Sequence, residues 1–159
     1  ACSCGRACRC SRACRSGRAC RSGRACRCSR CGDLLGDDAQ SAALHAGLDG
    51  KEIQGRRVTV RVFQDAEQWR REGKGCQALF ITPSAAGTWN ELRAEIAGQP
   101  VLTICESPGF CEQGGMINLY EDDHRIRFEA NPAAADQAGL KLRSTLLTLA
   151  TIVKTKGGK

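Results

Sequence analysis

The sequence predicts an α/β fold, a three-layer domain with a mixed, mainly parallel sheet and a β-hairpin toward the C-terminus. From Leu34 onward, short apolar or β-branched runs such as residues 58–63 (VTVRVF) alternate with amphipathic stretches. That alternation favours parallel strands with helices on both faces of the sheet. A polar turn at residues 121–124 lies between two strand-like runs, which indicates an antiparallel hairpin.

In the first two thirds of the domain, helices and strands are expected to alternate. The predicted helices begin at Asp38, at Asp65 and at the Pro83-Ser84 pair, which are typical helix-start signals. The predicted order is a helix over 39–48, a strand over 58–63, a helix ending at 71, a strand over 76–81, a helix over 84–97 and a strand over 101–105.

The C-terminal third departs from this plan. Asn131 followed by Pro132 is a helix-start signal, because Asn is a favoured cap and Pro fits the first turn. The expected elements are a hairpin of residues 116–120 and 125–129, a helix from 131 to about 139 and a last helix over 144–153.

Composition divides the chain at about residue 31. Residues 1–31 hold nine of the 12 cysteines, nine of the 24 Lys and Arg residues and no acidic residue. The other 15 basic and 17 acidic residues leave the rest of the chain near neutral, despite the formal net charge of +7. We therefore predict a globular domain over residues 32–154, with no electrostatic case for binding nucleic acid. Residues 155–159 are expected to form a disordered tail.

The first 31 residues repeat a hexad, Gly/Ser-Arg-Ala-Cys-Arg-Ser/Cys, and contain no Leu, Ile, Val, Phe or Met. Disorder is expected, because such a segment cannot form an apolar core. Three interpretations are open: an Arg-rich arm that binds polyanions, cysteine-based metal or thiol chemistry, and a tandem repeat in GC-rich coding DNA read out of frame. Metal binding is disfavoured because no His is near and the C-x₂-C spacing of zinc sites is not repeated. We favour the third interpretation, because Gly, Arg, Ala, Cys and Ser are the residues that GC-rich triplets tend to encode.

Cys105 and Cys111 flank the segment Glu-Ser-Pro-Gly-Phe, whose Pro-Gly pair favours a turn. Such a turn brings the two sulfurs within disulfide reach. One interpretation is a structural or redox-responsive disulfide in an oxidising compartment. The alternative is two unrelated thiols, one of them packed at a strand end. Cys76 opens a predicted buried strand, so its simplest interpretation is a core residue.

Catalytic chemistry has no assembled candidate in the sequence. His45 and His124 are isolated, and no nucleophile lies beside a base, so we predict neither an enzyme nor a metal or cofactor site. Gly114 and Gly115 either shape a turn or present backbone N–H groups to a ligand or partner. Together with Phe110, they mark a loop that is a candidate for contacting a partner.

Eight segments, taken in their order and spacing, resemble the YfiR-like family over residues 34–153. They are LGDD at 35–38, IQGRRV at 53–58, GCQALFI at 75–81, PVLT at 100–103, SPGF at 107–110, GGMIN at 114–118, IRFE at 126–129 and AGLKLRS at 138–144. The resemblance implies a small secreted α/β domain.

By this resemblance, the chain is a periplasmic regulatory binding protein, although no signal peptide is visible in it. The best-understood relatives restrain a membrane-bound diguanylate cyclase, and so influence cyclic-di-GMP signalling and biofilm formation. The implied partner is such a cyclase or another membrane sensor protein, and a homodimer is a further expectation. The alternative function is a sensory domain that binds a small ligand without catalysis.

The chain departs from the family pattern at its start. Relatives usually carry an aromatic-rich helix before a first strand that ends in Leu-Gly-Asp, and here the hexad repeat occupies that place. The expected result is a disrupted first strand and an uncovered sheet edge or apolar face. Some relatives pair a cysteine of that strand with the counterpart of Cys76. Here Asp33 takes that position, so the resemblance makes a Cys31–Cys76 bridge a hypothesis.

Overall fold

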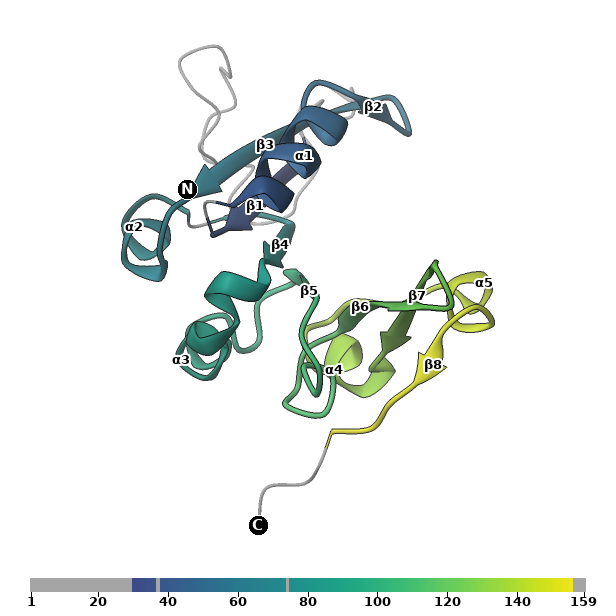
Figure 1. Cartoon of the computed structure of the whole chain (residues 1–159). Helices are drawn as coiled ribbons and strands as arrows, with labels where there is room; N and C mark the ends of the chain where they lie inside the picture. The colour runs from purple at the N-terminus through teal and green to yellow at the C-terminus, as the bar shows by residue number, and fades with distance from the viewer. Residues whose placement is uncertain (1–29, 37, 74, 156–159) are drawn as a thin grey trace, which may run out of the picture.

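The computed structural model describes residues 30–36, 38–73 and 75–155. The hexad repeat up to residue 29 and the last four residues lie outside the described residues. The described chain forms one eight-stranded sheet in the order β2-β3-β1-β4-β5-β6-β7-β8 (Figure 1). The β2–β3 and β6–β7 pairs are antiparallel and the others are parallel. The predicted fold class is therefore confirmed.

Strands and helices alternate along the first two thirds of the chain. The strands are β1 (Arg30–Leu35), β2 (Glu52–Ile53), β3 (Arg56–Phe63), β4 (Ala78–Ile81), β5 (Leu102–Cys105), β6 (Ile117–Asp122), β7 (Arg125–Ala130) and β8 (Thr151–Ile152). The helices are α1 (Ala39–Leu48), α2 (Ala66–Glu72), the 3₁₀-helix η2 (Pro83–Thr88), α3 (Trp89–Glu95), α4 (Pro132–Gln137) and α5 (Ser144–Leu147).

The hairpin of β6 and β7 is confirmed, with a tighter turn than expected. Only Asp123 and His124 lie between the two strands, and both have positive φ, at 49° and 56°. Positive φ at both central residues is the geometry that joins antiparallel strands with the natural twist. The turn therefore has no room for the four residues that the sequence suggested.

Two predicted elements were wrong in detail. The helix expected over residues 84–97 is divided into η2 and α3. The last helix ends at Leu147 rather than at residue 153, and Thr151 and Ile152 instead pair with β7 as β8. β-branched side chains suit a pleated strand better than a helix, which explains the change near the C-terminus.

The first strand is intact, so the expectation of a disrupted strand was wrong. β1 lies inside the sheet, parallel to β3 on one side and to β4 on the other. Its polar residue Asp33 fits there because the carboxylate has partners of its own, described below.

The two faces of the sheet are covered by different helices. Leu35, Ile81 and Cys105 lie side by side in register and face α2, η2 and α3, which contribute Trp69, Trp89 and Leu92 to the core. We call this side the α3 face. The alternate residues Leu34, Phe80 and Ile104 face the opposite side, which we call the α1 face, where α1 covers β1 and β3 and α4 covers β5 to β7.

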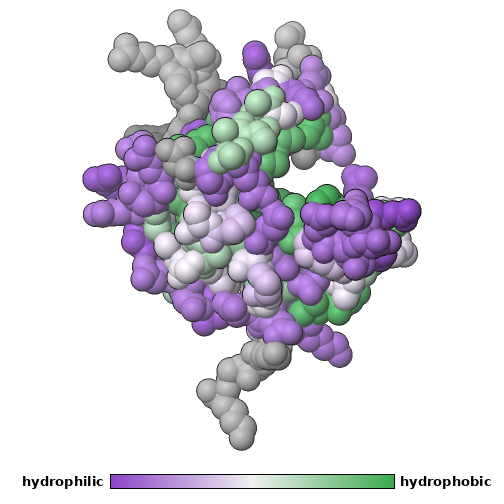
Figure 2. All heavy atoms as spheres, viewed as in Figure 1, coloured by the Kyte–Doolittle hydropathy of each residue, from purple (hydrophilic) through white to green (hydrophobic). Residues whose placement is uncertain are grey.

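The connection from β5 to β6 carries no helix. Parallel neighbours need a crossover, which is usually helical, yet residues 106–116 make it as a series of tight turns. The face of the molecule seen in Figure 1 is covered mostly by polar side chains, with apolar patches between them (Figure 2). The crossover loop contains Cys111, Gly114 and Gly115, and it begins directly after Cys105, the last residue of β5.

Candidate functional site

The crossover loop (residues 106–116) is fastened at several points to the elements around it. The Ser107 N–H donates to Asn118 Oδ1 at 2.9 Å, and Asn131 Nδ2 donates to the Cys111 carbonyl at 2.8 Å. Asn118 and Asn131 are 3% and 0% exposed, so both amides are structural. Buried amides that bond backbone groups fix a loop that has no regular secondary structure.

Cys105 ends β5 just before this loop and Cys111 lies within it, and no disulfide joins them in the described chain, so their pairing stays a prediction. Both side chains are fully buried, and both sulfurs are free thiols. Burial raises the pKa of Cys105 to about 11. Burial also raises the pKa of Cys111 to about 12, with smaller contributions from Glu129 and from Cys105 itself. Both thiols are therefore protonated at neutral pH.

Phe110 anchors the middle of the loop. Its ring lies 4.7 Å from the Trp89 ring centroid at an interplanar angle of 52°, and only 3% of the residue is exposed. It also covers Gly115, where an added Cβ would come within 2.2 Å of the Phe110 ring. Gly115 is required for this close approach, whereas Gly114 has a positive φ of 92° and shapes the turn.

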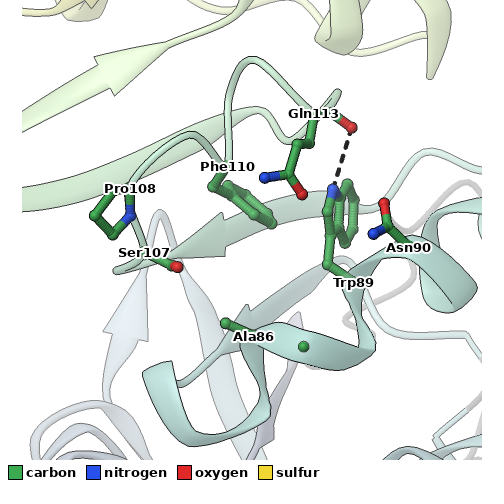
Figure 3. Close-up of a pocket in the computed structure, with 8 residues that line it drawn as sticks. Ala86, Trp89, Asn90, Ser107, Pro108, Phe110 and Gln113 are labelled. Atoms are coloured by element: carbon green, nitrogen blue, oxygen red, sulfur yellow. Dashed lines mark hydrogen bonds between the residues drawn. The ribbon is translucent and has the colours of Figure 1, made fainter.

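A shallow hollow of about 250 Å³ lies between the loop and the η2–α3 segment. Figure 3 shows Pro108 and Phe110 on one side, and Trp89 and Asn90 on the other. Gln113 also lines the hollow, and its main-chain carbonyl accepts a hydrogen bond from Trp89 Nε1 at 3.2 Å. Phe110 and Gly115 of the predicted contact loop are buried and Gly114 is half-buried, whereas Pro108 and Gln113 are exposed and accessible to a partner.

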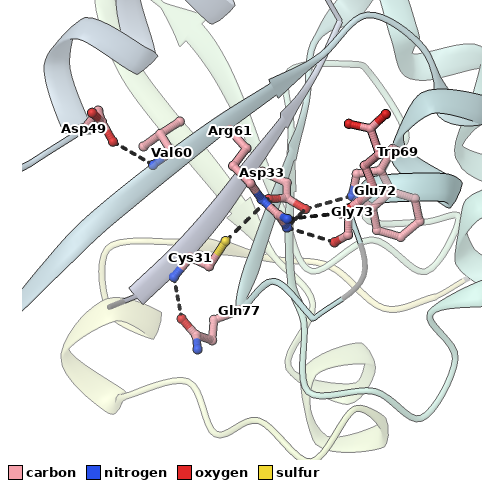
Figure 4. A network of polar contacts seen from close by, with 9 residues as sticks. All are labelled: Cys31, Asp33, Asp49, Val60, Arg61, Trp69, Glu72, Gly73 and Gln77. Atoms are coloured by element: carbon pink, nitrogen blue, oxygen red, sulfur yellow. Dashed lines mark hydrogen bonds and ion pairs between the residues drawn. The ribbon is translucent and has the colours of Figure 1, made fainter. Parts of the chain in front are cut away.

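A second cluster lies on β1 and β3, centred on Asp33 (Figure 4). The Arg61 guanidinium donates to both Asp33 oxygens at 2.9 Å, and Trp69 Nε1 donates to Oδ2 at 3.0 Å. Arg61 also reaches the carbonyls of Glu72 and Gly73 at the end of α2. Burial raises the pKa of the Asp33 carboxyl, and the Arg61 charge and the Trp69 N–H offset part of that cost.

Cys31 and Cys76 converge on this same carboxylate. Cys31 Sγ donates to Asp33 Oδ1 at 3.7 Å, and the Cys76 thiol also interacts with Asp33. Cys31 is half-buried and Cys76 is 5% exposed, which agrees with Cys76 as a core residue. Burial raises the pKa of both thiols. The structure thus brings the pair together, with both sulfurs free.

Sequence reasoning missed the Asp33–Arg61–Trp69 cluster. One signal was present in the sequence: Arg61 lies two residues before Phe63, so both side chains are on the same, buried face of β3. Asp33 and Arg61 are also direct neighbours across β1 and β3, which only the strand register reveals. His45 and His124 contribute to neither cluster: His45 lies half-buried on α1, and His124 lies at the exposed tip of the hairpin.

Within the described ranges, no three His, Cys, Asp or Glu side chains are placed to hold a metal ion. Among the helices that the structure describes, none has the length and apolar character of a membrane span.

The comparison with protein families decides the identity of the domain. The sequence pattern of the family described as YfiR/HmsC-like matches residues 33–151, about three quarters of the chain. The chain belongs to the YfiR/HmsC-like family. The match begins inside β1 and ends at β8, so it includes every helix that the structure describes, the crossover loop and the Asp33–Arg61–Trp69 cluster, but not Cys31. YfiR/HmsC-like proteins are periplasmic regulators of diguanylate cyclase signalling. No curated protein matches the chain.

Proposed function

We propose that this YfiR/HmsC-like chain acts in the periplasm as a binding protein that restrains a membrane-bound diguanylate cyclase, or another membrane sensor protein. Through cyclic-di-GMP this restraint would control biofilm formation. Family membership over residues 33–151 carries the proposal. The fold supports a binding role, because the crossover loop presents an exposed Pro108 beside the buried core residues Phe110 and Trp89.

The proposal includes a redox response at the crossover loop. An oxidised dithiol protein of the periplasm would accept two electrons and two protons from Cys105 and Cys111, leaving a disulfide between the sulfurs. The buried, protonated thiols are poor nucleophiles in the folded loop, because the thiolate is the reactive form. We therefore expect the bond to form during folding or when the loop opens. The Cys31–Cys76 pair is a second candidate bridge.

Capture of partners from detergent-solubilised membranes tests the proposal. The full chain is immobilised with and without reductant, and a matched Cys105→Ser/Cys111→Ser variant serves as the control. We expect the native chain to recover a diguanylate cyclase or sensor protein. We also expect reductant to change the amount recovered by the native chain but not the amount recovered by the variant. Equal recovery by both chains, with and without reductant, would contradict the proposed redox response. Recovery of no membrane protein would contradict the proposed binding role.

A ligand-binding sensory domain is the second candidate function. The hollow beside Trp89 and Phe110 favours it, because aromatic walls and the polar groups of Asn90 and Gln113 surround it. Its volume of about 250 Å³ lies below the ~300–1,000 Å³ of typical small-molecule sites. Thermal stabilisation of the isolated chain by a periplasmic metabolite extract, with no protein partner present, would support this function over the first.

A further inference from the structure

The β8 edge of the sheet presents large apolar side chains to solvent. Of the six large hydrophobic residues that are exposed in the described chain, three lie there: Ile126 at 69%, Leu149 at 76% and Ile152 at 50%. Ile126 belongs to β7, Leu149 follows α5 and Ile152 belongs to the edge strand β8. Figure 1 shows α5 and β8 beside the β6–β7 hairpin. Exposed large apolar residues that lie together mark a contact surface.

Leu149 and Ile152 are exposed because the chain leaves the core after α5. Leu142 and Leu146 pack against the apolar cluster that contains α4, whereas Leu149, three residues further on, lies mostly in solvent. The Leu149 N–H donates to the Leu146 carbonyl at 3.1 Å, so a hydrogen-bonded turn carries the side chain. Ile152 pairs in register with Ala130, which places it on the α1 face at the edge of the sheet.

The charges that accompany these side chains along the sequence are all basic. Residues 137–159, which directly follow Asp136 of α4, contain five Lys and Arg residues and no acidic residue. Three of the five lie within the described chain and are exposed: Lys141 and Arg143 before α5, and Lys154 after β8. Exposed apolar side chains flanked by Lys and Arg are typical of proteins that lie on an anionic membrane surface.

Acidic residues set one boundary of this surface. Glu121 lies directly opposite Ile126 across the hairpin, and Asp122 and Asp123 follow it at the turn. An anionic membrane repels these carboxylates. The hairpin turn and Ile126 therefore lie outside the contact, and Leu149 and Ile152 form its centre.

We propose that the α5–β8 segment (residues 141–154) is a membrane-contact surface that lies on an anionic bilayer. Leu149 and Ile152 enter the headgroup region, and the lipid phosphates bind Lys141, Arg143 and Lys154. Two large apolar side chains insert only weakly, so the binding is reversible and depends on anionic lipid. Each basic side chain near such a surface raises the affinity roughly 5-fold. The contact needs no protein partner, so it is independent of the proposed restraint of a cyclase.

Tryptophan quenching by brominated lipid locates the contact on the full chain, in reductant so that the cysteines form no cross-links. Trp69 and Trp89 are 5% and 3% exposed, so an added surface tryptophan supplies the fluorescence that lipid can quench. Leu149→Trp should lose most of its added fluorescence on vesicles of phosphatidylethanolamine and brominated phosphatidylglycerol. Ile53→Trp, at an exposed position of β2 on the opposite edge of the sheet, is the matched control and should keep it. Vesicles of brominated phosphatidylcholine should quench neither variant.

Cosedimentation with the phosphatidylglycerol vesicles measures the contribution of the basic residues. Lys141→Gln/Arg143→Gln should weaken binding by more than ~10-fold. Lys51→Gln/Arg71→Gln removes two exposed basic residues elsewhere and should leave the binding near its native value. Equal weakening by the two double variants would overturn the proposal.

The nine Arg residues of the first 31 positions can also attract anionic lipid. If they alone bind, the chain will sediment with the vesicles while Leu149→Trp stays unquenched. That result would overturn the proposal, as would equal quenching of Leu149→Trp and Ile53→Trp, or no binding to the vesicles at all.

Discussion

Asp33 and Arg61 form a bidentate ion pair across β1 and β3, with the guanidinium Nε and Nη2 each 2.9 Å from a carboxylate oxygen. The Asp33 side chain is fully buried, while the Arg61 side chain is 23% exposed. Arg61 also binds the last carbonyls of α2, so one side chain joins two central strands to a helix. Removing either charge would leave the other without its partner in a site that water reaches poorly.

Arg61→Leu should therefore lower the free energy of unfolding by about 3 kcal/mol, because an unpaired buried carboxylate is costly. Urea unfolding in reductant measures the change. Arg71→Leu, at an exposed position on α2, is the matched control and should stay within ~0.5 kcal/mol of the native chain. Adding Asp33→Asn to Arg61→Leu should recover part of the loss; additive losses would show that the two residues are not coupled.

This cluster shows why part of the site was not predictable from sequence. Capping residues and β-branched runs are local signals, and they correctly placed α1, β3 and the β6–β7 hairpin. The Asp33–Arg61 contact depends instead on the register between two strands that lie 28 residues apart in the chain. The same reason explains the missed strand β8, because two helices, α4 and α5, separate it in the chain from its pairing partner β7.

The N-terminal cap of α1 predicts how the stability of the fold depends on pH. Burial alone would raise the pKa of Asp38, but hydrogen bonds from the Ser41 N–H and from the Thr82 and Ser84 hydroxyls hold it below the ordinary value. A carboxyl with a lowered folded-state pKa stabilises the fold above its unfolded pKa of ~3.9, and this contribution is lost as pH falls through the folded value.

Asp38→Ala should cost ~1 kcal/mol at neutral pH, the usual value of a helix N-cap. The difference in stability between Asp38→Ala and the native chain should shrink as the pH falls below the pKa of an ordinary aspartate. Asp38→Asn keeps an acceptor for the Ser41 N–H without titrating, so it serves as the control. Thermal unfolding across an acid series measures all three chains, and a constant cost for Asp38→Ala at every pH would contradict the prediction.

The buried thiols give a prediction about reactivity. A thiol pKa of about 11 at Cys105 and about 12 at Cys111 lowers the thiolate fraction at neutral pH at least ~100-fold relative to an ordinary cysteine. In the reduced, folded chain both residues should be alkylated at least that much more slowly than in urea. Mass spectrometry of peptides after timed alkylation resolves each site. Equal rates in the folded and unfolded chains would show that the loop opens freely.

The contact of Phe110 with Gly115 predicts strong coupling between these residues. Phe110→Ala should cost about 3 kcal/mol or more, because it removes a buried ring from the core. Gly115→Ala should also destabilise, because the new methyl group would meet the Phe110 ring. In the Phe110→Ala background, Gly115→Ala should cost far less. A cost that is the same in both backgrounds, measured by urea unfolding, would rule out the proposed clash.

Restraint of a diguanylate cyclase from the periplasm is most directly tested by the cellular concentration of cyclic-di-GMP. The chain is produced with an added export signal in a strain that carries the cyclase identified in the membrane capture experiment. The same chain without the export signal is the control. The exported chain should lower cyclic-di-GMP several-fold, and the unexported chain should not. Equal cyclic-di-GMP in the two strains, with the exported protein folded and present in the periplasm, would contradict the proposed function.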